Sequence, residues 1–188
     1  MNRKMWKLTN EEYEFIKGEV AFIFEKYQIR CTPVSGFEIA TKMGIKLIPY
    51  SALTETQQKL AREKCPDGYV IETNDGRKLI YYNDIDWSYE HQNWTILHEI
   101  GHIVLDHRGI DQEKEEDEAD FFAKYAIAPP ILVHKIGAES PLDIYENFDI
   151  SLEASVYAYH YYESWRDGYF QVGRLTEYEK KILKTFSA

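Results

Sequence analysis

The sequence predicts an α+β fold: a single, mainly helical domain that carries one small antiparallel sheet. Apolar residues spaced three and four apart, the pattern of a helix buried on one side, recur towards both ends of the chain. Between them, two β-rich runs over 68–73 and 77–82 flank Asn74-Asp75-Gly76, which is a strong hairpin signal. The chain has 188 residues, of which 44% are hydrophobic, and this suffices for the core of one compact domain.

The N-terminal part, residues 1–64, is predicted to contain helices and the first strand. Thr9 is a good N-capping residue, and Gly44 is suited to the left-handed position that ends a helix. The elements expected here are a helix from Thr9 to about Gln28, a short helix over 36–43, a strand over 45–49 and a weaker helix over 51–64.

The middle part, residues 65–130, is predicted to hold the hairpin and then two helices. The C-terminal part, residues 131–188, is predicted to contain helices only. No repeat or flexible linker separates the three parts, so they are expected to form one domain. The helices expected after the hairpin cover 89–106, 112–126, 130–136, 141–147, 151–166 and 176–185.

Charge and cysteine content narrow the function classes. A formal net charge of −10 argues against a nucleic-acid-binding surface, which needs Lys and Arg to replace counterions. The stretch from Met1 to Leu8 lacks the apolar segment of a signal peptide, and no run is long enough to span a membrane. Cys31 and Cys65 are too few for a disulfide framework. We therefore expect a cytoplasmic protein with reduced thiols.

The most informative motif is His98-Glu99-x-x-His102, set in an apolar helical pattern. Histidines four residues apart project from the same face of a helix and can occupy two positions of a tetrahedral zinc site. Glu99 lies to the side of that face, where it can take a proton from a water without binding the metal itself. Burying two histidines on an apolar face without a partner would be costly, so metal binding is favoured over two core histidines.

A catalytic zinc needs a third protein ligand, and the acidic run over 111–120 offers candidates. Such a run is usually a solvated helix face, but its end leads into residues that should be buried. On a helix, Glu116 and Asp120 share a face, so Glu116 can bind the metal while Asp120 accepts the free ring N–H of a histidine ligand. The order of preference for the third ligand is Glu116, then Glu118, then Glu115.

His107 is the alternative third ligand. Zinc proteases with the long histidine motif have a glycine followed by a third histidine ten residues after the first. Leu105 and Arg108 occupy those two positions here, so this variant is disfavoured.

The segment His98-Glu-Ile-Gly-His102-Ile-Val-Leu-Asp-His107, followed by Glu116-Asp-Glu-Ala-Asp-Phe-Phe-Ala123 and Ala128-Pro129, resembles the ImmA/IrrE family of metallopeptidases. The similarity is good over about 65–130, and the flanks match only in the order of helices. It implies a zincin-like fold with a thermolysin-like helix pair, in which the ligand glutamate precedes an aspartate by four residues. That analogy supports Glu116 as ligand and Asp120 behind it.

The resemblance also implies a function. Members of the family are cytoplasmic zinc proteases that cut a helix-turn-helix repressor and so release genes of mobile elements, prophages or stress responses. Many members carry a helix-turn-helix domain on the same chain. None is recognised in this sequence, so DNA contact is assigned to the partner, and neither direct nucleic-acid binding nor membrane association is expected.

The predicted enzyme holds one Zn²⁺ per chain on His98, His102 and Glu116, with Glu99 as general base. Stabilisation of the oxyanion needs another hydrogen-bond donor. The aromatic-rich helix over 157–162 contains four tyrosines and one histidine, and Tyr157 and His160 are the candidates chosen from them. Core packing is the more common role for such a stripe, and Ala158 stands about where the family often has an arginine. The strand over 77–82 is a candidate edge for pairing with an extended substrate.

Two rival interpretations remain at this point. A regulator could bind and sequester the repressor without cutting it, although an intact Glu99 disfavours a purely structural metal site. A zinc hydrolase acting on a small substrate is the weaker rival. The sequence leaves the substrate, the cleavage site and the oligomeric state open.

Overall fold

The computed structural model describes residues 8–187, so the predictions made for Met1–Lys7 and for Ala188 lie outside the described residues. No helix in this part of the chain is long and apolar enough to cross a membrane. The helices are α1 (Asn10–Lys26), α2 (Gly36–Met43), α3 (Glu55–Lys64), α4 (Tyr89–Val104), α5 (Gln112–Ile127), α6 (Pro130–Lys135), α7 (Pro141–Phe148), α8 (Leu152–Val172) and α9 (Glu177–Thr185), with a 3₁₀ turn η1 (Tyr50–Ala52). The strands are β1 (Lys46–Pro49), β2 (Gly68–Glu72) and β3 (Lys78–Tyr82).

The sheet has the order β1-β3-β2 and is mixed. β2 and β3 form the predicted antiparallel hairpin, with Val70 opposite Ile80. β1 pairs with β3 in parallel. Between β1 and β2 the chain passes through η1 and α3, so that β1 and β2 lie on opposite sides of β3. The α+β class is therefore confirmed, whereas the expectation of a wholly antiparallel sheet is wrong for β1. β3 is the central strand, so it cannot provide the free edge proposed for it.

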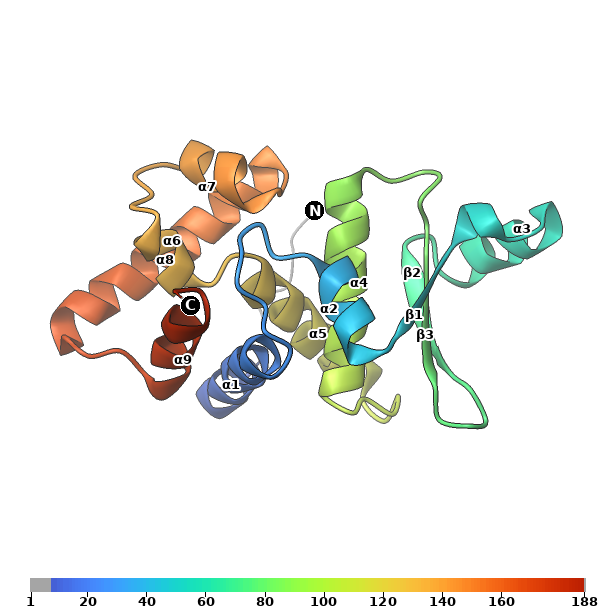
Figure 1. Cartoon of the computed structure of the whole chain (residues 1–188), viewed down its shortest axis with the longest axis horizontal. Coiled ribbons are helices and arrows are strands. Elements are labelled where there is room, and N and C mark those ends of the chain that lie inside the picture. Colours follow the sequence, from blue (N-terminus) through green and yellow to red (C-terminus); the bar gives the residue numbers. More distant parts are fainter. Residues whose placement is uncertain (1–7, 188) are drawn as a thin grey trace.

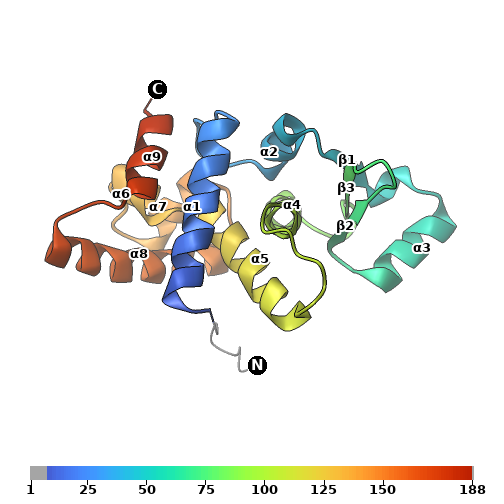
Figure 2. The ribbon, with the colours of Figure 1, turned by 90° about the horizontal axis from the view of Figure 1, so that it is seen from below.

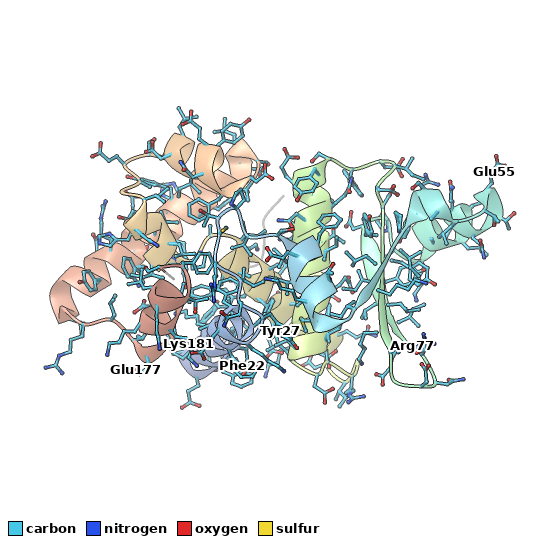
Figure 3. All side chains as sticks on the ribbon, in the orientation of Figure 1. Phe22, Tyr27, Glu55, Arg77, Glu177 and Lys181 are labelled. Atoms are coloured by element: carbon cyan, nitrogen blue, oxygen red, sulfur yellow. The ribbon has the colours of Figure 1, made fainter. Side chains whose placement is uncertain are left out.

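α4 lies in the middle of the molecule, between the sheet and α5 (Figures 1 and 2). On the other side of α5 lies α1, which also packs on α9, and the remaining C-terminal helices gather beyond them. The labelled Glu55 on α3 and Arg77 at the hairpin turn lie away from α4 and α5 (Figure 3). This order leaves α4 covered on two opposite sides.

The apolar core surrounds the α4–α5 pair. Ile96, Leu97 and Ile100 of α4 are all completely buried, and they meet Ile80 of β3 and Phe122 of α5 in one cluster. Truncating one of these side chains to alanine would cost about 2–5 kcal/mol of stability. α4 is therefore held firmly by its neighbours.

α8 is longer than predicted: it begins where expected but runs on to Val172 rather than ending at about residue 166. Trp165 and Tyr169, four residues apart, stack with ring centroids 5.3 Å apart, and such pairs stabilise a helix. The helix ends where Gly173 takes the left-handed conformation, with φ of 66°.

Candidate metal centre

His98, Glu99 and His102 are placed by α4. Ser88 caps the start of this helix, where its side chain accepts a hydrogen bond from the His91 backbone N–H. At Gly101, a Cβ atom would lie only 3.2 Å from the Cα of Ala119 on α5. The absence of a side chain at residue 101 therefore allows α4 and α5 to approach closely, beside the two histidines.

The two histidines and Glu116 bring one ligand atom each to a common point. His98 Nε2 lies 3.1 Å from His102 Nε2 and 3.2 Å from Glu116 Oε2, and His102 Nε2 lies 3.5 Å from Glu116 Oε1. Zinc–ligand bonds of about 2.0–2.1 Å in a tetrahedron place neighbouring ligand atoms about 3.3–3.4 Å apart. The three residues thus have the donor atoms for a zinc ion, and one ligand atom from each lies within 4.8 Å of the other two.

Asp120 lies behind His98. Its Oδ1 atom is 3.1 Å from the fully buried Nδ1 of His98, on the side of the ring opposite the ligand atom. A carboxylate in this position holds the proton of His98 on Nδ1 and leaves Nε2 free to bind a metal. The structure brings Asp120 to ion-pair distance of His98, but the two atoms do not have the geometry of a hydrogen bond, so the supporting role of Asp120 stays a prediction.

His102 has a different neighbour behind it. Its Nδ1 atom lies 2.7 Å from Nδ1 of His107, and Nε2 of His107 lies 3.0 Å from Glu118 Oε2. His107 and Glu118, both considered as possible metal ligands, are therefore adjacent to the group but do not belong to it. The sequence analysis did not predict the contact between His107 and Glu118.

Glu115, the third candidate of the acidic run, caps the loop between α4 and α5. Its carboxylate accepts hydrogen bonds from the backbone N–H groups of Arg108, Gly109 and Ile110, at 2.8–3.2 Å. These bonds lower its pKa, although desolvation acts in the opposite direction. Glu115 is thus engaged in the loop and lies outside the ligand group.

Glu99 is buried, with 7% of its surface exposed. Burial raises the pKa of Glu99 to about 7; the charge of His98 opposes the rise and that of Glu116 adds to it. The backbone of Val70, on β2, lies close enough to the Glu99 carboxylate to act against this rise in pKa. A carboxylate with a pKa near neutrality can both accept and return a proton at physiological pH.

The two motif histidines differ in pKa. Burial works against the charged form of His98, but contacts with Asp120 and Glu116 outweigh it and raise its pKa to about 9. Burial, together with the charge of His98, lowers the pKa of His102 to about 4. His102 is therefore neutral near pH 7, which is the state that binds a metal.

Tyr157 and His160 are both exposed on α8. His160 Nδ1 lies 3.2 Å from Glu163 Oε2 of the same helix. Within residues 8–187, no hydrogen bond, ion pair or ring contact joins either residue to the ligand group, so their proposed catalytic role stays a prediction.

A cavity of about 220 Å³ opens beside His102, between β2 and α4. Val70 of β2 and Ile103 of α4 line its apolar part, and Glu72 and Lys78 lie at its polar part. Because His102 lines it, the cavity is next to the ligand group.

The helix pair, its His₂Glu ligand group and the buried Glu99 together define a metallopeptidase type of site. Residues 40–160 match the family model of the IrrE N-terminal-like domain, Peptidase M78. Because the match covers more than half of the chain, the chain belongs to this metallopeptidase family, as the sequence resemblance implied. A comparison with curated proteins finds no match.

Proposed function

We propose that the protein is a zinc-dependent endopeptidase that cleaves a helix-turn-helix transcriptional repressor in the cytoplasm. The observation that carries the proposal is the convergence of His98, His102 and Glu116, with ligand atoms within 4.8 Å of one another, beside the buried Glu99. Two imidazoles and one carboxylate with an open fourth position are the ligand set of catalytic zinc.

A zinc ion held by His98, His102 and Glu116 would supply a water whose pKa is near neutrality and would polarise the peptide carbonyl. Glu99 takes the proton of the attacking water and then donates it to the leaving amine. Asp120 keeps His98 in the tautomer that presents Nε2. Tyr157 and His160 are the proposed candidates for the donor that stabilises the oxyanion.

A peptide substrate is supported by the geometry of β2. This strand lies at an edge of the sheet, and the backbone of Val70 on it lies beside Glu99. An extended peptide that pairs with this edge would pass next to Glu99, and a side chain could enter the cavity by His102. The net charge of −10 favours a basic partner such as a DNA-binding repressor.

The test uses the products of the neighbouring genes on the chromosome as candidate substrates. Each is mixed with the zinc-loaded wild type, with Glu99→Gln and with the control Glu90→Gln on the same helix. We expect cleavage by the wild type and the control. Glu99→Gln is expected to keep zinc but to lose about 10²–10⁴-fold in rate. A residual rate within tenfold of the wild type would place the base elsewhere.

The same variants separate cleavage from sequestration. If Glu99→Gln still relieves repression in cells while cutting nothing, the protein acts by binding the repressor. A metal test stands beside this one: Glu116→Ala is expected to lose most of the zinc, because two remaining protein ligands form a poor site. Full zinc occupancy in Glu116→Ala by elemental analysis would contradict the ligand assignment.

A further inference from the structure

We propose that His107 and Glu118 form a support that holds His102 in the orientation and tautomer required for metal binding. The inference rests on the metal site of the proposed function, and it assigns a positioning role to two residues outside the ligand group.

The end of α4 delivers His107 to this position. Asp106 takes the left-handed conformation, with φ of 55°, and the His107 N–H donates a hydrogen bond to the His102 carbonyl at 3.0 Å. This bond and the one from Asp106 N to Ile103 O, at 3.4 Å, form a Schellman motif, the common way to end a helix. The motif usually brings two apolar side chains together, whereas here it brings together two imidazoles.

The hydrogen-bond pattern allows only one arrangement of protons. If His102 binds the metal through Nε2, its proton is on Nδ1 and is donated to His107 Nδ1, 2.7 Å away. His107 Nδ1 must then be the acceptor, so the proton of His107 is on Nε2. From there it is donated to Glu118 Oε2, at 3.0 Å. Each donor in this series meets an acceptor.

The support is enclosed and anchored. The His107 side chain is only 6% exposed and that of Glu118 only 18%. Lys114, one turn before Glu118 on α5, lies 3.8 Å from it and also pairs with Glu12 of α1. Lys114 thus helps to hold the Glu118 carboxylate in place next to the ring of His107.

The two ligand histidines obtain their support in different ways. Asp120 reaches His98 directly from α5, at 3.1 Å. His102 lies one turn further along α4, and there the imidazole of His107 spans the space between His102 and the carboxylate of Glu118. Outer partners of zinc-bound histidines typically contribute a 10–100-fold factor in metal affinity.

The first test measures zinc affinity by competition with a chelator in the full-length wild type, His107→Phe and Glu118→Gln. His134→Phe, on α6, and Asp117→Asn, next to Glu118, are the matched controls. We expect both support variants to bind zinc about 10–100-fold more weakly and both controls to bind like the wild type. Unchanged affinity in Glu118→Gln, or in a folded His107→Phe, would overturn the proposal.

The second test reads the tautomers in the zinc-loaded wild type and needs no variant. Long-range ¹H–¹⁵N NMR correlations of the histidine rings are expected to show a proton on Nδ1 of His102 and on Nε2 of His107. A proton on Nδ1 of His107 would refute the proposal, because this nitrogen could then not accept the hydrogen bond from His102. If the wild type binds no zinc at all, the proposed function fails; if it binds zinc with the other His107 tautomer, only this inference fails.

Discussion

Replacing Gly101 with alanine is expected to destabilise the protein by forcing α4 and α5 apart. The added Cβ would lie 3.2 Å from Ala119 Cα and 3.2 Å from both Cβ and Cδ1 of Phe122. Two of these atoms are fixed to the backbone of α5 and cannot rotate away. The contact is therefore relieved only if the helices separate by a few tenths of an ångström.

Gly18 provides a matched control, because it also lies inside a helix but nothing is within 4 Å of an added Cβ. Alanine is favoured over glycine in a helix by about 0.5–1 kcal/mol, and this gain applies at both positions. Overpacking costs about 1–3 kcal/mol and applies only at Gly101. Gly101→Ala is therefore expected to be about 1–3 kcal/mol less stable than Gly18→Ala.

The assay is urea and thermal unfolding of both variants and the wild type, with zinc removed by a chelator so that metal binding does not mask the difference. For a chain of this length, 1 kcal/mol corresponds to about 2–4 °C in Tm. Gly18→Ala is expected to melt above the wild type and Gly101→Ala below Gly18→Ala. Equal stability of the two variants would refute the argument that residue 101 sets the helix separation.

Three further predictions follow from the site and from the contact between α1 and α5. His98→Ala or His102→Ala is expected to abolish stoichiometric zinc in elemental analysis, and full occupancy in either variant would contradict the site. Asp120→Asn is expected to weaken zinc binding by about 10–100-fold in chelator competition. Unchanged affinity would show that Asp120 does not support zinc binding by His98. Lys114 and the Thr9 cap lower the pKa of Glu12 to about 2, so ionised Glu12 stabilises the fold above about pH 4.5 and this contribution is lost as the pH falls towards 2. Because the Glu12–Lys114 pair is exposed, it contributes about 0.2–1 kcal/mol to stability. In Lys114→Gln, the free energy of unfolding measured by urea titration should fall less between pH 4.5 and pH 2 than in the wild type. An equal fall in the two proteins would contradict this prediction.

Most elements could be predicted because their signals are local. Thr9 and Ser35 accept hydrogen bonds from the backbone at the starts of α1 and α2, and the turn around Gly76 closes the hairpin. The parallel pairing of β1 with β3 could not be predicted, because it joins residues about thirty positions apart and leaves no local pattern. The extension of α8 depends on the stacking of Trp165 on Tyr169, which a count of apolar positions does not reveal.

The ligand group could be predicted because helical spacing alone places His98 and His102 on one face and Glu116 with Asp120 on another. The relation between His107 and Glu118 could not, because it depends on the left-handed Asp106 and on the path of the loop. A signal does exist in the sequence: the second residue after the C-cap folds back on the last turn whenever the helix ends in a Schellman motif. His107 was considered only as a ligand, and this geometry was not applied to it.

From its sequence, the acidic run on α5 looked like an ordinary solvated helix face. In the structure, four of its side chains make four different contacts. Glu115 holds a loop, Glu116 faces the two motif histidines, Glu118 meets His107 and Asp120 stands behind His98. Four chemically similar residues are therefore not interchangeable, and a redesign that treats the run as a surface for charge adjustment would damage four distinct contacts. A mutational scan of α5 should show this directly, as intolerance at these positions and tolerance at the intervening Asp117.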